Sequence, residues 1–479
     1  MINIMTMHGS FAVFNGNDLH PLSRMQNMYR EIHVIIKHMK TLGIFKGFYC
    51  GCIIKHFAII IQQNSILCHL ILIKCRYNIM YGEKKMSVYL TAKHLNTAEK
   101  FVNNAKKNNK STFYDAERFW YEQENSMRDP WHGVQVPLGM VKMPVFCAFA
   151  ELGFDEDFYR LEHDAEFRSM LCRQYNDLSE KLIGRRIMDD VQPPVKLWPE
   201  IKTVYDIFES KKFWHIDSYW NSQSAKNEYE LDALLDRVEY RIENINEYIF
   251  PADWHNIKTG RLSEGRAIPV NRSIRGPVTL ATTVYGVENL VYLINDNQAL
   301  AQRFRDLIIK AIIIQAETID KEFGTAEDDQ YCRFSFFDDY CALLNREMYE
   351  FFGYPVLKAV FEKFAPRPEN IRFQHSDSSM EHLLPVLVRT GINDINFGPD
   401  LALSTIRRHF PKAVIRGQLA PFTFSRNEEI NMVAEFIRDF ETAKESKGII
   451  FSTSGSINNG SRLSGLRLLM TAVRDLGKY

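Results

Sequence analysis

The sequence predicts an α/β fold, a (β/α)8 TIM barrel with an N-terminal helical subdomain. Two observations support this prediction. In the second half of the chain, short apolar runs alternate with helical stretches, and each run ends at small or polar residues. Four such runs cover residues 372–377, 392–399, 413–421 and 448–456. Because strands that alternate with helices form a parallel sheet, we expect the chemistry at the carboxyl ends of these strands.

The length and the charge of the chain restrict its class. The 479 residues suffice for one large barrel, and Lys+Arg and Asp+Glu balance at 59 each. No overall basic field exists, so nucleic acid is not an expected partner. The eight cysteines are scattered, and the close pair Cys50 and Cys52 has one intervening residue instead of the two of a redox or zinc pair. A cytoplasmic protein is therefore expected.

Residues 1–85 differ in composition from the rest of the chain. They are rich in Ile, His, Lys and Cys and poor in acids. Their apolar runs, at 57–61 and 66–73, are far shorter than the roughly 20 residues that a membrane span needs, so no membrane is expected as a partner. We interpret residues 1–85 as an extension that is disordered, or as upstream DNA read as protein with translation starting at Met86. A native peptide from before Met86 would contradict the second interpretation.

Two further domains are predicted after this extension. Residues 86–184 are expected to form the helical subdomain, interrupted by the loop at 129–137, whose prolines and glycine exclude a continuous helix. Residues 185–479 are expected to form the barrel, with Ile-Met-Asp-Asp at 187–190 as its first strand. Residues 231–249 carry apolar residues at helical spacing with Glu and Arg between them, which is typical of an amphipathic outer helix.

The next segment predicts a tight turn from strand to helix. A strand within residues 267–281 runs into Gly276 and Pro277, a pair that favours such a turn, and a helix is expected to begin near Thr279. Residues 298–323 then have the apolar spacing of a long helix.

An aromatic-rich strand at 331–337 ends at two adjacent acids, Asp338 and Asp339. Adjacent carboxylates repel, so both are seldom buried without a cation, a cluster of donors or a helix amino terminus. Either acid could simply cap the helix expected at 343–352, because capping is a common role of acids. A role in binding metal or substrate is the alternative.

The strand at 372–377 places His375 two residues before Asp377. Side chains two apart on a strand point to the same side, so an imidazole and a carboxylate leave the strand end together. The two residues could be nitrogen and oxygen ligands of a metal. Asp377 could instead orient His375 as a general acid or base, and His375 could also bind substrate or be a hydrogen-bonded core residue.

Five segments across residues 265–479 occur in the order of the motifs of a known family. They are the Arg-Gly-Pro-Val-Thr-Leu-Ala turn at 275–281, the strand and Pro-terminated helix at 337–355, the His-containing strand end at 373–378, the Arg-Gly-Gln-Leu-Ala-Pro turn at 416–421 and the last strand at 448–457. The chain thus resembles the uroporphyrinogen decarboxylase superfamily of (β/α)8 barrels. This superfamily includes the cofactor-free porphyrinogen decarboxylase and zinc-dependent methyltransferases that work with corrinoid proteins.

The sequence also departs from the family pattern. Asp377 stands where the methyltransferases have their first zinc Cys. Ser454, Gly455 and Ser456 occupy the turn that carries their second Cys or the late His of the decarboxylase. Ala420 replaces an Asp of the family, and the amino-terminal Met-Arg-Gln-Ala-Gly-Arg motif that grips substrate carboxylates is not visible.

The resemblance implies an enzyme that moves a methyl group from a methylated small molecule to a corrinoid carried by a partner protein. Zinc would be held by His375, Asp377 and Asp338, with Asp339 as the alternative third ligand. His375, Asp377 and Asp338 are also the expected catalytic residues. The resemblance further implies a homodimer. The expected substrate-binding residues are Asp339, Gly276, Gln418 and Ser454.

Two alternatives remain at this point. The first is a carboxy-lyase of the uroporphyrinogen decarboxylase type in porphyrin biosynthesis. It would use a carboxylate among Asp338, Asp339 and Asp377. The substrate acetates would need cations, which Arg275, Arg372 and Arg416 could supply if their side chains reach the barrel mouth. The second is a barrel that binds a ligand without catalysis, which the loss of the terminal Cys or His favours.

Overall fold

The computed structural model describes residues 90–107, 115–140, 143–188, 198–325 and 331–479. All of them belong to the second of two compact units, Met86–Tyr479. The predictions for residues 1–85 therefore lie outside the described residues. Within the described ranges, no helix is long and apolar enough to cross a membrane.

The first described helices confirm a helical N-terminal region. Their bounds are α4 (Ala92–Lys107), α5 (Ala116–Arg128), α6 (Cys147–Leu152), α7 (Phe158–His163) and α8 (Ala165–Ile183). Asp115, Asp157 and Asp164 cap α5, α7 and α8, since each carboxylate accepts a hydrogen bond from a backbone N–H of the first turn. The buried apolar side chains of α5, α6 and α8 share one core with residues from the end of the chain.

A hairpin and a group of helices come before the second strand of the central sheet. Their bounds are α9 (Val204–Ile207), β1 (Lys212–His215), β2 (Ser218–Asn221), α10 (Glu228–Glu243), α11 (Ile245–Ile249), α12 (Trp254–Ser263), α13 (Pro277–Tyr285), α14 (Val287–Asp296) and α15 (Gln298–Phe323). The helix predicted at 298–323 is confirmed as α15. The helix predicted at 231–249 forms as two pieces, α10 and α11, which meet at Asn244.

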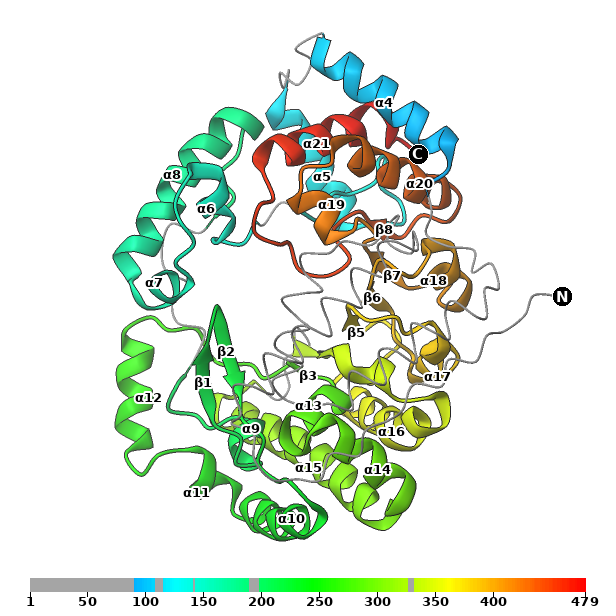
Figure 1. The fold of residues 1–479 in the computed structure, drawn as a ribbon. Coiled ribbons are helices and arrows are strands. Elements are labelled where there is room, and N and C mark those ends of the chain that lie inside the picture. The colour runs from blue at the N-terminus through cyan, green and yellow to red at the C-terminus, as the bar shows by residue number, and fades with distance from the viewer. Residues whose placement is uncertain (1–89, 108–114, 141–142, 189–197, 326–330) are drawn as a thin grey trace, which may run out of the picture. The chain divides into compact units, whose positions relative to one another are not determined.

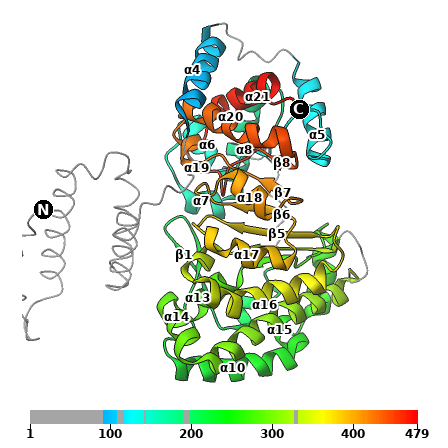
Figure 2. The same ribbon diagram turned by 90° about the vertical axis from the view of Figure 1, so that its right-hand side faces the viewer.

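Six parallel strands form the central sheet in sequence order. They are β3 (Ser273–Arg275), β4 (Arg333–Phe337), β5 (Ile371–Ser376), β6 (Asp394–Phe397), β7 (Val414–Arg416) and β8 (Ile449–Ile450). The helices after β4 are α16 (Arg346–Phe364), α17 (Leu384–Leu387), α18 (Leu403–His409), α19 (Pro421–Ser425), α20 (Glu429–Ser446) and α21 (Leu463–Leu476). Among them, α16, α17 and α18 lie along one face of the sheet (Figures 1 and 2).

The two faces of the sheet differ in chemistry. Phe336, Gln374 and Ile395 are aligned across β4, β5 and β6, and all three are buried on the helix-covered face. Their neighbours in sequence point to the other face, because successive side chains of a strand alternate. That second face carries the aligned residues Phe337, His375 and Asn396 and, beside Asn396, Arg416.

The parallel ladder continues beyond β8. Leu138 pairs with Phe451 in parallel fashion, and Gly139 N–H donates to Phe451 O at 2.8 Å. The prediction of a first strand at 187–190 is wrong for Ile187 and Met188, which are outside any strand, and residues 189–190 are not described. Leu138, and not residues 187–188, lies next to the end of β8, because its backbone pairs with Phe451. A mixed α/β fold with a parallel sheet is thus confirmed, whereas closure into eight strands stays a prediction.

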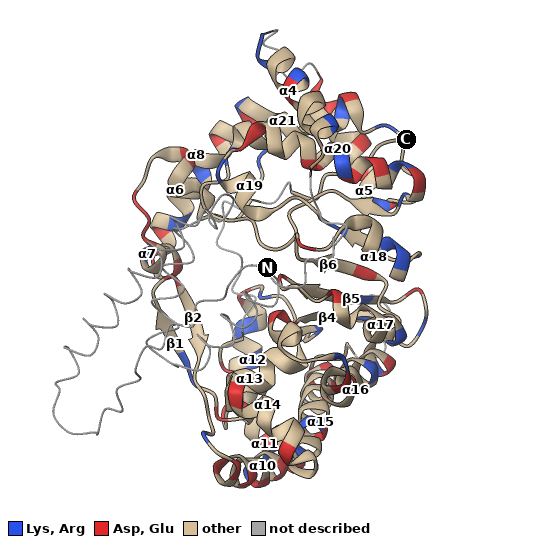
Figure 3. Ribbon diagram, turned by 45° about the vertical axis from the view of Figure 1, so that its right-hand side comes forward, with Lys and Arg blue, Asp and Glu red and all other residues tan. Residues whose placement is uncertain are grey.

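Charged residues lie on the outer helices with both signs interspersed (Figure 3). Ion pairs between neighbouring elements account for many of them. Arg303, for example, contacts Asp232, Asp236 and Glu239. This mixture agrees with the balanced composition.

Candidate functional site

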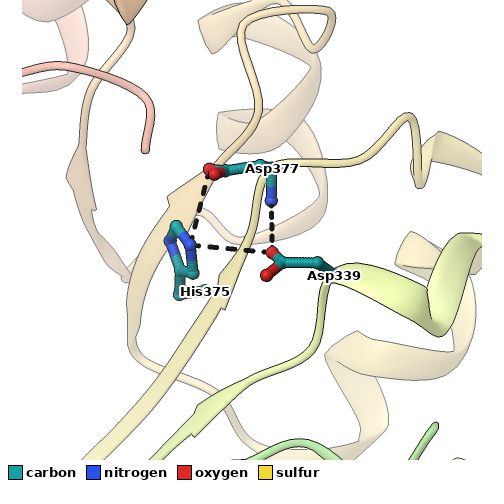
Figure 4. Close-up of side chains that lie close together, drawn as sticks. All are labelled: Asp339, His375 and Asp377. Atoms are coloured by element: carbon teal, nitrogen blue, oxygen red, sulfur yellow. Dashed lines mark hydrogen bonds and ion pairs between the residues drawn. The ribbon is translucent and has the colours of Figure 1, made fainter. Parts of the chain in front are cut away.

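Three side chains meet where β4 and β5 end. Phe337 and His375 are paired in register, so Asp339 and Asp377, each two residues further along, emerge side by side. His375 Nε2 is 3.7 Å from Asp339 Oδ1 and 3.4 Å from Asp377 Oδ1, as Figure 4 shows. One ligand atom from each residue lies within 4.8 Å of the other two. We call Asp339, His375 and Asp377 the His375 cluster.

Hydrogen bonds fix Asp339 from two sides. Its Oδ1 accepts from the backbone N–H of Asp377 at 3.0 Å, and its Oδ2 accepts from Arg275 Nη1 at 3.2 Å. Asp338 N–H also donates to His375 O at 2.9 Å, which joins the ends of the two strands. The cluster is therefore built on paired backbone and is not carried by a long loop.

The environment of the cluster places two carboxylates beside one exposed cation. Burial raises the pKa of the Asp377 carboxyl group. The neighbouring Asp339 raises this pKa further, whereas His375 and Arg275 act to lower it. The His375 side chain is 12% exposed, whereas those of Asp339 and Asp377 are 36% and 50% exposed. The imidazole is thus held inside and the carboxylates open toward solvent, which leaves access for a ligand.

His375 is held by a further residue, Asn396 of β6. His375 Nδ1 lies 2.8 Å from Asn396 Oδ1. On the other side of the imidazole, the ring of Phe337 lies 5.5 Å from that of His375 and 5.8 Å from that of Phe373. One wall of the cluster is therefore aromatic.

The structure does not bring Asp338 into the cluster. Its side chain is fully buried, and Oδ1 accepts from Thr279 N–H and Thr279 Oγ1, both at 2.8 Å. Oδ2 accepts from Val278 N–H at 3.4 Å. Burial raises the pKa of Asp338 to about 6. Asp338 thus satisfies the amino terminus of α13, and the third position predicted for Asp338 is taken by Asp339, because alternate residues leave a strand on opposite faces.

Gly276 lies against Asp338 and not against the cluster. A Cβ at Gly276 would come within 2.2 Å of Asp338 Cβ. Only glycine leaves room for this approach, which lets β3 end beside the buried acid. Gly276 therefore has a role in packing, and its binding of substrate stays a prediction.

Gln418 and Ser454 are both buried, and neither is a member of the cluster. Gln418 Nε2 donates to Leu401 O at 2.8 Å, and Ser454 N–H donates to Leu419 O at 2.8 Å. Ser454 Oγ has no hydrogen-bond partner among the described residues. A substrate role for these two residues stays a prediction.

Gly455 brings the last turn against the cluster. Its backbone has φ +109°, and a Cβ there would lie 2.3 Å from Asp377 Oδ1. The sequence names Arg275 as a candidate cation for substrate, but it does not identify Gly455 or Asn396 as neighbours of His375. The available signal was Asn396 itself, a polar residue between the apolar Ile395 and Phe397.

A separate cavity of about 460 Å³ is lined by the β1–β2 hairpin, by helices α7 and α8 and by residues 143–146 and 187–188. Aromatic side chains line much of it, including Phe146, Phe158, Trp214 and Tyr219. No member of the His375 cluster lines this cavity. We place the chemistry at the cluster, because three ligand-type atoms of the described residues converge there.

Comparisons with known proteins bear on the second half of the chain. Residues 256–476 match the family model of uroporphyrinogen decarboxylase (URO-D). The chain is also similar to the solved structure of a methyltransferase from Methanosarcina mazei, with 14% identity and a TM-score of 0.42 over 71% of this chain and 94% of that chain. No curated protein matches the sequence. The family match confirms the resemblance predicted for residues 265–479.

Proposed function

We propose, from the uroporphyrinogen decarboxylase match of residues 256–476, that this protein is an enzyme that transfers a methyl group from a small methylated substrate to a corrinoid protein. One observation carries the proposal. Asp339, His375 and Asp377 place an imidazole nitrogen and two carboxylate oxygens within 4.8 Å of one another at the open edge of the sheet. Such an arrangement is suited to a cation with a position left for substrate.

The donor set fits a zinc ion. Nitrogen of His and oxygen of Asp are ordinary zinc ligands, and three protein ligands with an open position are typical of catalytic zinc sites. Two carboxylates that face one imidazole nitrogen also need positive charge to balance them. Cys341, the nearest cysteine in sequence, is buried with Sγ 3.6 Å from Ser376 Oγ and is not part of the cluster. The site is therefore harder than a thiolate site.

Bound zinc would act as a Lewis acid that polarises the heteroatom from which the methyl group departs. The residues of the chain would provide the rest of the environment. Asp339, His375 and Asp377 would hold the ion, and the rings of Phe337 and Phe373 would offer an apolar wall for the methyl group. Arg275, 53% exposed beside Asp339, would attract an anionic part of the substrate.

We propose four further features of the protein. They are closure into a (β/α)8 barrel, a homodimer, a cytoplasmic location and a corrinoid carried by the partner protein. The cytoplasmic location rests on the scattered cysteines, and the other three features rest on the family resemblance. Each can be tested separately from the cluster.

Decarboxylation of a porphyrinogen has less support from the arginines. That reaction would need several cations for the substrate acetates. Arg372 lies on the helix side of β5 and donates to Ala365 O, while Arg416 is paired with both oxygens of Asp394. Arg275 is the one of these three arginines that contacts the cluster.

The test is the zinc content of purified protein, measured by elemental analysis together with methylation of a reduced corrinoid. We expect about one zinc per chain in the wild type and much less in His375→Ala and Asp339→Asn. Asp400→Asn, which removes an exposed acid after β6, is the matched control and should keep zinc.

Other outcomes would contradict the proposal in different ways. Equal zinc in wild type and His375→Ala would remove His375 from the ligands. A metal-free protein that decarboxylates a porphyrinogen would establish the carboxy-lyase alternative. A metal-free protein inert in both assays would leave the ligand-binding barrel.

A further inference from the structure

The amide of Asn396 lies between His375 and three backbone groups. Its Nδ2 donates to Arg416 O at 2.6 Å and to Thr453 O at 3.1 Å. Its Oδ1 accepts from Gly455 N–H at 3.1 Å and lies 2.8 Å from His375 Nδ1. One side chain of β6 thus reaches β5, the end of β7 and the turn after β8.

These backbone groups fix the orientation of the amide. A carbonyl oxygen can only accept, so the NH2 group of Asn396 must face Arg416 O and Thr453 O. A backbone N–H can only donate, so the amide oxygen must face Gly455. The reversed amide would set its oxygen against two carbonyl oxygens and its NH2 against an N–H. The acceptor beside His375 is therefore determined by atoms other than His375.

The orientation of Asn396 decides where His375 carries its hydrogen. Because Asn396 Oδ1 is an acceptor, His375 Nδ1 must be the N–H donor. A neutral imidazole has one N–H, so Nε2 then carries a lone pair. That lone pair faces the oxygens of Asp339 and Asp377 at 3.7 Å and 3.4 Å.

We propose that Asn396 is a positioning residue that fixes His375 as the Nδ1–H tautomer and thereby directs the Nε2 lone pair toward the two carboxylates. Three acceptor atoms then face one another, and a cation between them satisfies all three. Histidines that bind metals commonly donate their other ring N–H to such a partner. The inference concerns the metal-free protein and rests on the proposed function only in naming zinc as the cation.

The first measurement is the tautomer of His375 in the metal-free wild type. Protein labelled with 15N histidine gives long-range proton–nitrogen correlations that distinguish Nδ1–H from Nε2–H, and His375→Ala assigns the signal. We expect the Nδ1–H pattern in the wild type. An Nε2–H pattern would overturn the inference whether or not the protein binds zinc.

The second measurement compares two asparagines. Asn393 also bridges strands, since its Oδ1 accepts from Arg372 N–H at 2.9 Å and its Nδ2 donates to Asn370 O at 2.8 Å, but it lies at the opposite end of the sheet. Asn396→Ala is expected to lose the fixed tautomer and to bind zinc about 10–100-fold more weakly in a titration with Zn²⁺ alone. Asn393→Ala is expected to keep both properties.

The outcomes separate this inference from the proposed function. A folded Asn396→Ala with unchanged tautomer and unchanged zinc affinity would refute the positioning role while leaving the enzyme proposal intact. A wild type that shows the Nδ1–H tautomer but binds no zinc would support the positioning role and contradict the zinc proposal. If Asn396→Ala does not fold, the tautomer of the wild type decides.

Discussion

Two adjacent acids, Asp338 and Asp339, have opposite environments. Asp338 points into the helix-covered side of the sheet, where Val278 N–H, Thr279 N–H and Thr279 Oγ1 all donate to it. Asp339 points to the open side, where it meets His375, Asp377 and the partly exposed Arg275. One carboxylate is fully satisfied by the fold, and the other is grouped with a second acid beside an imidazole.

The difference separates structural acids from candidate functional ones. An acid whose oxygens are occupied by donors of the protein has nothing left to offer a ligand. An acid that faces another acid at a solvent-accessible edge has a need for positive charge that the surrounding protein meets only in part. Substitution on the two sides should therefore affect different measurements.

The largest effect is expected for Asp338→Ala. This change leaves three donors at the start of α13 without their acceptor, and we expect it to lower the unfolding free energy by about 2–4 kcal/mol. Denaturant unfolding followed by circular dichroism measures the loss. Asp339→Ala is the control and should cost less than about 1 kcal/mol. Equal losses for the two variants would refute the division between them.

Glu435 is a second buried acid whose oxygens accept hydrogen bonds from the protein, and it should make the stability of the protein depend on pH. Its carboxylate accepts from Ala420 N–H and Thr423 Oγ1, both at 2.7 Å, with Arg438 and Asp439 as charged neighbours. Burial raises its pKa from 4.5 to about 7. Between these pH values the folded protein holds a proton that the unfolded chain has released, so stability is full below pH 4.5 and falls as pH rises toward 7.

The expected size of this fall is at most on the order of 3 kcal/mol, and less once the buried group relaxes. Glu435→Gln should flatten the dependence, as measured by the unfolding free energy at several pH values between 4.5 and 7. Glu445→Gln, on the exposed side of the same helix, is the control. An unchanged slope in Glu435→Gln would show that Glu435 is not the group responsible.

Gly455→Ala tests the open side of the sheet by placing a methyl group against Asp377. The new Cβ would lie 2.3 Å from Asp377 Oδ1 and should displace that carboxylate, so we expect zinc affinity to fall about tenfold, or ~1.4 kcal/mol. Gly153→Ala has a similar positive φ with no heavy atom within 4 Å of the new Cβ. This control should lose stability from backbone strain but keep zinc affinity. Loss of zinc in both variants would point to strain alone.

The smallest effect is expected for Arg275→Gln. Arg275 is half exposed and partly neutralises Asp339, so its removal should strengthen zinc binding by about two- to fivefold at low salt and less at high salt. Titration with Zn²⁺ at two salt concentrations measures the change. Arg333→Gln, at the amino end of β4, should leave the zinc affinity unchanged at both salt concentrations. Weaker zinc binding in Arg275→Gln would mean that Arg275 supports the site.

Much of the fold was predictable because it depends on local patterns. Apolar spacing marked α15 at its observed bounds, and the strand at 331–337 is confirmed as β4 with a start two residues later. The place of the site at the ends of β4 and β5 was also expected from alternation along the chain. These features need only the periodicity of strands and helices.

The identity of the third cluster residue could not be predicted in the same way. Asp338 and Asp339 differ only in which face of the sheet they point to, and that depends on the register of β4 against β5. Asn396 depends on even more distant segments, since its partners lie at positions 375, 416, 453 and 455. Such convergence is a property of packing and leaves no short motif in the sequence.

The four partners of Asn396 also bear on how such α/β folds can be recombined. Strand-end loops are commonly treated as exchangeable modules on a constant scaffold. Here the turn at 453–455 supplies both a carbonyl and an N–H to the residue that orients His375. A transplanted turn that changes this backbone would alter the orientation of the imidazole from three strands away. The last turn and the histidine strand should therefore be exchanged together with β6.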